Sequence, residues 1–293
     1  MKSLTRKDQF DQEVDIHYSD LGKGQPVILL HGWPMSLEMW EYQIEDLVNS
    51  GLRVIKYDRR GFGKSSKPWF GYDYDTFTDD LQFIIESLQL QDVILVGFSM
   101  GGGEVARYFT RYGGAKVAKV VLLGAVPPFL LKTNDNPDGI ERSVFEEMIT
   151  GIKKDRIDFL DTFGKQFFGF NMISHPLSTP LLEYYRNLAS VASQRSTVEC
   201  VKAFGETDFR NDLKNINVPT LIIHGDADKI VPIEVSSQIT AKAIKGSRLI
   251  VYEGAPHGFF YTDRIRLNRD LVQFITGSIP ELFTTTQAQG SQP

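Results

Sequence analysis

The 293-residue sequence contains a single cysteine and no excess of basic charge. Cys200 cannot form an intramolecular disulfide, and it lies far from any histidine-rich segment that would activate its thiol. The 32 Lys and Arg residues face 37 Asp and Glu residues, which leaves a net charge of −5. These absences exclude a disulfide scaffold, and they argue against a nucleic-acid partner or an anionic membrane surface.

Long hydrophobic runs are also missing. The longest apolar stretch, residues 120–131, contains Pro127 and Pro128 and is too short and too interrupted to span a bilayer. Residues 1–20 are charged throughout and lack the apolar segment of a secretory signal peptide. We therefore expect a cytoplasmic protein without a membrane partner.

The residues that are present indicate a folded protein with a large core. Hydrophobic residues make up 42% of the chain, aromatic residues 12% and charged residues 24%, a balance typical of globular proteins rather than disordered or fibrous chains. We expect Cys200 to be a small buried residue of this core.

Six short apolar runs recur along the chain, each rich in β-branched residues and bounded by turn-forming residues. This pattern predicts strands that are covered on both faces. Apolar spacing typical of amphipathic helices occurs most clearly over residues 75–90 and 263–276. Because parallel neighbours need a helical crossover, the alternation predicts an α/β fold with a doubly wound, mostly parallel sheet. The predicted strands cover residues 26–31, 53–58, 92–97, 117–124, 219–224 and 247–252.

The strand rhythm stops between residues 127 and 217, where the sequence is dense in aromatic residues and helical in its spacing. We interpret residues 127–217 as an inserted helical cap, or lid. The core domain then comprises residues 1–126 and 218–282. Residues 283–293 are polar and carry no periodicity, so we expect a loose C-terminal tail there.

A candidate nucleophile follows the third predicted strand. The segment Gly97-Phe-Ser-Met-Gly101 is a G-x-S-x-G element that leads into a predicted helix. In this context the glycines permit a sharp turn that holds the serine hydroxyl above the sheet. The alternative is a small-residue turn that merely links strand to helix. The strand-to-helix context favours Ser99 as the nucleophile.

A serine hydroxyl needs a general base and an acid that orients this base, and in such a fold they follow in the order Asp, His. Asp228 and His257 each follow a predicted strand, where an open α/β sheet places its ligand site. We assign His257 as the base and Asp228 as the acid. Asp226 is a second candidate for the acid, and the spacing does not exclude it, although aspartates in such loops usually anchor the turn. A metal site of His224, Asp226 and Asp228 lacks calcium or zinc ligand spacing, so no metal is expected.

The tetrahedral intermediate of acyl transfer also needs two hydrogen-bond donors for its oxyanion. The backbone N–H of Met100, directly after the nucleophile and at a helix N-terminus, is one candidate. The other is the N–H of Trp33, in the loop after the first predicted strand. Pro34 has no N–H and cannot serve.

Five motifs follow predicted strands of the sheet. They are His31-Gly-Trp-Pro34, Asp58-Arg-Arg-Gly-Phe-Gly-Lys-Ser-Ser66, Gly97-Phe-Ser-Met-Gly-Gly-Gly-Glu104, His224-Gly-Asp-Ala-Asp-Lys-Ile-Val-Pro232 and Gly254-Ala-Pro-His-Gly258. Together they resemble the α/β-hydrolase superfamily and, more narrowly, its cofactor-free bacterial haloperoxidase and arylesterase branch. The resemblance implies an α/β-hydrolase fold with an inserted cap, a triad of Ser99, Asp228 and His257, and no cofactor. It also implies that Asp228, not Asp226, is the acid.

The resemblance further implies perhydrolysis, in which hydrogen peroxide replaces water and the released peracid oxidises halide away from the site. In the family, a proline beside the oxyanion-loop tryptophan is associated with this activity. The ring of Pro34 restricts Trp33, whose carbonyl is then placed to accept a hydrogen bond from peroxide. The alternative is a proline that only rigidifies the loop. We assign Trp33, Pro34, Phe129 and Phe163 to the substrate pocket.

The predicted function is a serine hydrolase that cleaves small acyl and aryl esters through an acyl-enzyme, with perhydrolysis as a second activity. The alternatives are a dedicated perhydrolase, an amidase or lactamase on the same triad, and a binding protein of the same fold, which is expected to lack a triad residue. The expected partners are a small ester and hydrogen peroxide. The sequence leaves a homo-oligomer open.

Overall fold

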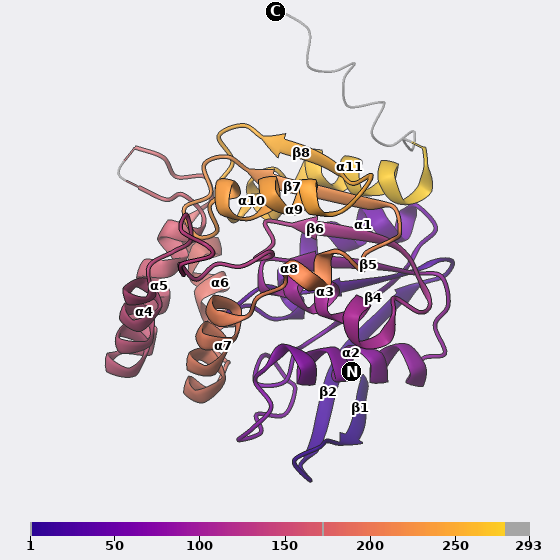
Figure 1. Cartoon of the computed structure of the whole chain (residues 1–293), viewed down its shortest axis with the longest axis horizontal. Helices are drawn as coiled ribbons and strands as arrows, with labels where there is room; N and C mark the ends of the chain where they lie inside the picture. The colour runs from indigo at the N-terminus through magenta and orange to yellow at the C-terminus, as the bar shows by residue number, and fades with distance from the viewer. Residues whose placement is uncertain (1, 172, 279–293) are drawn as a thin grey trace, which may run out of the picture.

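The computed structural model describes residues 2–171 and 173–278, and within them the chain forms an eight-stranded sheet flanked by helices (Figure 1). The strands in chain order are β1 (Lys2–Lys7), β2 (Glu13–Gly22), β3 (Pro26–Leu30), β4 (Arg53–Tyr57), β5 (Val93–Phe98), β6 (Val117–Leu123), β7 (Thr220–Gly225) and β8 (Arg248–Tyr252).

The sheet has the order β1-β2-β4-β3-β5-β6-β7-β8. The pairs β1/β2 and β2/β4 are antiparallel, and every pair from β4/β3 to β7/β8 is parallel. Strands β3, β5 and β7 are buried along nearly their whole length, as expected for a parallel sheet covered on both faces. The carboxyl ends of these parallel strands therefore open on one edge of the sheet.

Helices cover both faces of this sheet (Figure 1). Helix α1 packs against α11 on one face, and α2, α3, α8 and α9 follow one another on the other. No helix within the described part of the chain combines the length and the apolar character that a bilayer-spanning segment needs. The α-helices are α1 (Glu41–Asn49), α2 (Tyr74–Ser87), α3 (Met100–Tyr112), α4 (Arg142–Lys154), α5 (Arg156–Phe167), α6 (Thr179–Ser190), α7 (Gln194–Glu206), α8 (Arg210–Leu213), α9 (Ser237–Ala243), α10 (Phe259–Thr262) and α11 (Arg264–Thr276), with 3-10 turns at Leu37–Trp40 and Ile233–Val235.

All six predicted strands are present as β3 to β8, so the predicted α/β fold with a mostly parallel sheet is confirmed. The sequence analysis missed the antiparallel hairpin of β1 and β2. Residues of these two strands include many polar and charged side chains, and several remain exposed because the hairpin lies at the sheet edge. They therefore lack the continuous apolar run that identifies a strand buried on both faces.

The segment between β6 and β7 contains helices α4 to α8, and α4 to α7 gather at one end of the sheet (Figure 1). Helical structure begins only at Arg142. Residues 127–141 instead form turns and two isolated bridges, because this stretch contains Asn134-Asp-Asn-Pro-Asp-Gly139, a run of turn-forming residues. The tail predicted over 283–293 lies outside the described residues.

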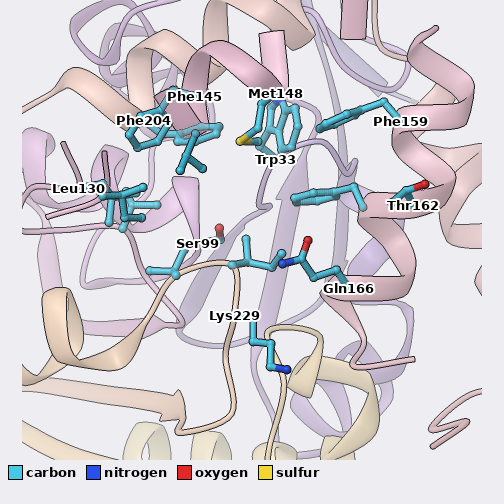
Figure 2. Close-up of a pocket in the computed structure, with 16 residues that line it drawn as sticks. Trp33, Ser99, Leu130, Phe145, Met148, Phe159, Thr162, Gln166, Phe204 and Lys229 are labelled. Carbon is cyan, nitrogen blue, oxygen red and sulfur yellow. The ribbon is translucent and has the colours of Figure 1, made fainter. Parts of the chain in front are cut away.

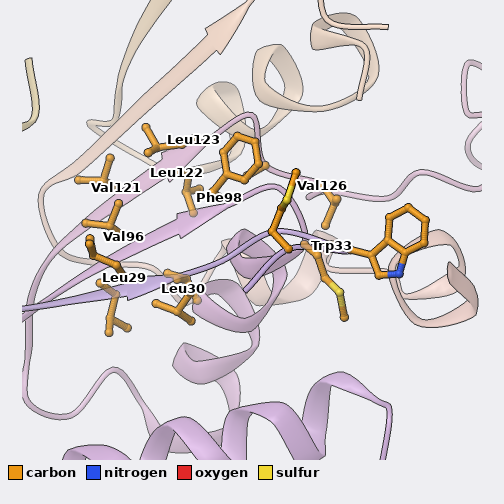
Figure 3. Packing of buried hydrophobic residues seen from close by; sticks show 14 of the residues in the cluster. Leu29, Leu30, Trp33, Val96, Phe98, Val121, Leu122, Leu123 and Val126 are labelled. Atoms are coloured by element: carbon orange, nitrogen blue, oxygen red, sulfur yellow. The ribbon is translucent and has the colours of Figure 1, made fainter. Parts of the chain in front are cut away.

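The hydrophobic core reaches the loops that carry the predicted site residues, and Trp33 and Val126 belong to it together with residues of the strands (Figure 3). Leu29 of β3, Val96 of β5 and Val121 of β6 are fully buried side by side in the sheet. Phe98, the last residue of β5, is also fully buried and directly precedes Ser99. Close packing at these strand ends gives the loops beyond them a rigid base.

Candidate active site

Ser99 lies in a sharp turn between β5 and α3. Its backbone has φ 53° and ψ −118°, a conformation that few residues with a side chain adopt and that costs about 1–3 kcal/mol. The N–H of Ser99 donates to the carbonyl of Leu123 at 2.8 Å, and the N–H groups of Gly102 and Val126 donate to the carbonyl of Ser99 at 3.0 and 3.2 Å. These bonds hold the strained turn in place.

The three residues predicted as a triad meet at the carboxyl edge of the sheet. His257 Nε2 lies 3.0 Å from Ser99 Oγ, and His257 Nδ1 lies 2.5 Å from Asp228 Oδ2. Asp228 follows β7, and His257 lies between β8 and α10. The side chains of His257 and Asp228 are fully buried. A hydroxyl, an imidazole and a carboxylate from three separate loops thus form one connected line.

Asp228 is the most heavily bonded member of this line. Its Oδ1 accepts from the N–H groups of Ile230 and Val231, both at 2.8 Å, and its Oδ2 contacts His224 Nε2 at 3.1 Å as well as His257. Burial raises the pKa of this carboxyl, but the charges and hydrogen bonds of His257 and His224 outweigh burial and hold the pKa well below its ordinary value. The carboxylate therefore stays ionised.

The contact between His224 and Asp228 was missed by the sequence analysis, which considered His224 only as a metal ligand. The other ring nitrogen of His224 lies 2.7 Å from Ser237 Oγ. Asp226 instead accepts a backbone N–H from the loop after β8 at 2.6 Å, as expected of a turn anchor. Within the described residues, no three His, Cys, Asp or Glu side chains are grouped to hold a metal ion. The short sequence separation of His224 and Asp228 was the signal that could have predicted their contact.

The two predicted oxyanion donors belong to elements that meet at Ser99. The N–H of Met100 is the first of α3, so it has no acceptor within the helix. The N–H of Trp33 donates to no carbonyl of the described residues. A Cβ atom placed on Gly32 would lie 3.1 Å from Ser99 Cβ, so the loop that carries Trp33 packs directly against Ser99.

Ser99 opens on a cavity of about 190 Å³ next to helices α4 and α5 (Figure 2). Its polar lining groups other than Ser99 are few, namely Thr162, Gln166 and Lys229. An apolar cavity with a small number of polar groups is typical of a site for a small organic ligand. The aromatic side chains of its wall are Trp33, Phe145, Phe159, Phe163 and Phe204.

A comparison with known protein families agrees with this geometry. Residues 25–263 match the family described as alpha/beta hydrolase fold. The chain belongs to this family. Its strand order and the Ser99 turn between β5 and α3 are the features on which the α/β-hydrolase site is built.

Individual members of the α/β-hydrolase family are similar along most of their length. The non-heme haloperoxidase of Rhodococcus erythropolis is 42% identical, over 89% of this chain and 96% of its own. The bifunctional esterase/perhydrolase DCH of Acinetobacter calcoaceticus is 40% identical over the same shares. The crystal structure of a bromoperoxidase from Bacillus anthracis covers 94% of this chain and 100% of its own, with 47% identity and a TM-score of 0.90. The predicted resemblance to this branch is confirmed.

The predicted pocket residues of this α/β hydrolase divide into two groups. Trp33 and Phe163 line the cavity, with ring centroids 5.1 Å apart. Phe129 and Pro34 are buried but do not belong to its lining. The irregular segment that carries Phe129 does reach the cavity, because Val126 and Leu130 line it. The ring of Phe129 itself packs against Arg210 at the start of α8, with 5.4 Å between the ring centroid and the guanidinium carbon.

The sequence analysis did not select Phe159 and Phe204, which also line the cavity. Phe159 stacks on Phe163 with centroids 5.8 Å apart, and Phe204 lies 5.5 Å from the ring of Trp33. Phe159 and Phe163 are spaced four residues apart on α5, so they share one helix face. This spacing was the signal for Phe159, whereas the position of Phe204 depends on how α7 packs.

Proposed function

We propose that the protein is a serine hydrolase that cleaves small acyl and aryl carboxylic esters through an acyl-enzyme. The observation that carries the proposal is the line of contacts from Asp228 through His257 to Ser99, with 2.5 Å and 3.0 Å between the paired atoms. Such an arrangement activates a serine hydroxyl, because the base lies within hydrogen-bonding reach of the nucleophile and the acid orients the base.

In the acylation step, Ser99 Oγ attacks the ester carbonyl carbon while His257 Nε2 takes the hydroxyl proton. The electron pair of the C=O bond moves onto oxygen, where the N–H groups of Trp33 and Met100 stabilise the negative charge. This intermediate collapses, the C=O bond re-forms and the alcohol oxygen leaves with the proton from His257. Ser99 then carries the acyl group.

In the deacylation step, water attacks the acyl carbon while His257 Nε2 takes a proton from it. The second intermediate expels Ser99 Oγ, which recovers its proton from His257, and the carboxylic acid departs. Asp228 stabilises the imidazolium in both steps without being protonated. The lowered pKa of Asp228 supports this role, because it keeps the group a carboxylate beside the His257 ring.

The cavity supports the choice of small substrates. A volume of about 190 Å³ with an aromatic wall accommodates a short acyl chain or an aryl ring better than a lipid or a sugar. We also propose that residues 127–217 act as a lid over the site. Phe159 and Phe163 of α5 and Phe204 of α7 lie in this segment and contribute to the cavity wall.

Perhydrolysis is the second candidate function. Two relatives with at least 40% identity carry names that include haloperoxidase or perhydrolase, and Pro34 follows the tryptophan of the oxyanion loop. In this reaction hydrogen peroxide attacks the acyl-enzyme in place of water, Ser99 Oγ leaves and a peracid is released. The peracid then oxidises halide in solution. The same nucleophile and base serve both reactions.

One pair of assays tests both functions. Hydrolysis of p-nitrophenyl acetate, and bromination of monochlorodimedone in acetate with hydrogen peroxide, are measured for wild type, Ser99→Ala and the control Ser190→Ala in α6. We expect Ser99→Ala to lose at least about 1,000-fold in kcat in both assays and Ser190→Ala to retain activity. Full hydrolysis by Ser99→Ala would contradict the proposal. If the wild type hydrolyses the ester but does not brominate, the perhydrolase proposal is contradicted and the esterase proposal stands.

A further inference from the structure

A buried ion pair joins two elements beside the candidate active site. Arg59 follows β4 and Glu104 lies in α3, and their side chains are 2% and 0% exposed. Nε and Nη2 of Arg59 both contact Glu104 Oε1. The hydroxyl of Tyr57 donates to Glu104 Oε2 at 2.8 Å. Both carboxylate oxygens of Glu104 are therefore used inside the protein.

The same guanidinium also reaches the loop that carries Trp33. Arg59 Nη2 donates to the carbonyl oxygen of His31 at 2.7 Å, and the backbone N–H of Arg59 donates to His31 Nε2 at 2.9 Å. His31 is the first residue after β3, two positions before Trp33. Arg59 thus holds this loop at its first peptide bond.

His31 extends the contact to the next peptide bond. Burial, together with the charge of Arg59, lowers the pKa of His31 well below its ordinary value, so the ring is neutral. Because its Nε2 accepts from Arg59, its Nδ1 carries the proton and donates to the carbonyl of Gly32 at 2.9 Å. The N–H of Met35 donates to the same carbonyl at 3.0 Å.

The carbonyl of Gly32 and the N–H of Trp33 belong to one planar peptide unit. When the Gly32 oxygen is held on one side by His31 and Met35, the Trp33 N–H is directed to the opposite side. The position of that carbonyl therefore determines where the Trp33 hydrogen lies. The chain of contacts that begins at Arg59 ends at a candidate oxyanion donor.

Glu104 connects Arg59 to the second candidate donor, the N–H of Met100. It lies four residues after Met100, one turn along α3, and a helix transmits such a constraint as a rigid unit. The contacts from Glu104 through Arg59 to His31 therefore link the helix that carries the Met100 N–H to the peptide that carries the Trp33 N–H.

We propose that Arg59 is a positioning residue of the oxyanion hole, which sets the N–H groups of Trp33 and Met100 relative to each other through His31 and Glu104. The inference rests on the proposed function, because only a reaction that passes through an oxyanion depends on this spacing. Oxyanion donors act over a narrow range, about 2.7–3.1 Å from the oxygen. The planar guanidinium of Arg59 donates to the Glu104 carboxylate and to the His31 carbonyl at the same time. A lysine ammonium lacks this planar arrangement of several N–H donors.

Arg60 offers a matched control at the next position. Its side chain is 0% exposed and forms ion pairs with Asp8 and Asp80. Within the described residues its side-chain hydrogen bonds go to these two carboxylates. Neither carboxylate belongs to the Trp33 loop or to α3. A general loss of stability from replacing a buried arginine should therefore affect Arg60→Lys as much as Arg59→Lys.

The test compares Arg59→Lys, Arg60→Lys and wild type with p-nitrophenyl acetate, after circular dichroism has shown that each is folded. We expect Arg59→Lys to lower kcat and kcat/KM together by about 10-fold or more while KM changes by less than about twofold, because the oxyanion exists only along the reaction path. Arg60→Lys should keep its kcat. The inhibition constant of an aryl trifluoromethyl ketone, whose adduct with Ser99 holds an oxyanion, should rise in Arg59→Lys alone.

Three results would overturn the inference: equal losses of kcat in the two variants, an unchanged kcat in folded Arg59→Lys, or a loss carried entirely by KM. If Arg59→Lys does not fold, Tyr57→Phe is the variant that tests the inference, because it removes only the hydroxyl that donates to Glu104. A lower kcat at constant KM then supports the proposal, and an unchanged kcat overturns it. Hydrolysis that survives Ser99→Ala would overturn the proposed function as well, whereas Ser99-dependent hydrolysis without an Arg59 effect overturns this inference alone.

Discussion

Trp33 has several roles at once in the candidate site. Its ring lines the cavity, its indole N–H donates to the carbonyl of Thr197 at 3.1 Å, and its backbone N–H is a candidate oxyanion donor. The direction of its carbonyl depends on the next residue, because the ring of Pro34 fixes one backbone dihedral and restricts the residue before it. Pro34 does not line the cavity, so we expect any effect of this residue on the chemistry to pass through Trp33.

We predict that Pro34→Leu lowers the ratio of perhydrolysis to hydrolysis. Leucine frees the backbone dihedral, so the Trp33 carbonyl is no longer held in the position where we propose that it accepts a hydrogen bond from peroxide. Loss of one such bond, worth about 1 kcal/mol, corresponds to a fall of about fivefold in this ratio. The ratio is the rate of monochlorodimedone bromination divided by that of p-nitrophenyl acetate hydrolysis. The exposed Pro137→Leu serves as a control, and an unchanged ratio in Pro34→Leu would leave Pro34 a structural role only.

Among the elements, the contact between α3 and β3 brings the Ser99 turn and the Trp33 loop together. A Cβ atom on Gly101 would lie 2.5 Å from the carbonyl oxygen of Leu30, a distance that no side chain tolerates without movement of the backbone. Gly164 in α5 differs, because the nearest atom to its added Cβ is Leu182 Cδ1 at 3.7 Å. One helical glycine is thus required by packing and the other is not.

We therefore predict opposite effects for the same substitution in these two helices. Gly101→Ala should lower the free energy of unfolding by about 1–3 kcal/mol through overpacking, and should lower kcat because α3 moves away from the Trp33 loop. Gly164→Ala should raise the free energy of unfolding by about 0.5–1 kcal/mol, because alanine favours a helix over glycine. Urea unfolding measures both. Equal changes in the two variants would contradict the packing argument.

Across the whole molecule, ion pairs connect the edge hairpin to the parallel sheet. Asp20 of β2 accepts two hydrogen bonds from Arg53 of β4, both at 2.9 Å. These bonds and the positive charge of Arg53 hold the pKa of Asp20 below its ordinary value of 3.8. Because the folded state lowers this pKa, the pair stabilises the fold fully above pH 3.8, and its contribution is lost as the pH falls below that value.

Asp20→Asn should therefore reduce the free energy of unfolding at pH 6 more than at pH 3. The asparagine cannot ionise, so in the variant this pair no longer makes the free energy of unfolding depend on pH. Asp228 contributes to that pH dependence in both proteins. Urea unfolding of both proteins at pH 6, 4 and 3 measures the difference. A gap between them that stays constant over this range would show that Asp20 does not contribute through its charge.

The sequence by itself determined the parallel part of the sheet, and it singled out Ser99, Asp228 and His257, which the fold brings together, as the candidate triad. Strands buried on both faces leave continuous apolar runs, and a serine turn between strand and helix leaves a glycine pattern, so both are legible as local features. The tertiary structure alone decided that Phe204 rather than Phe129 lines the cavity, that His224 also contacts Asp228, and that Arg59 bridges α3 and the Trp33 loop. Such contacts join residues far apart in the chain, and they depend on how elements pack, which no local periodicity records.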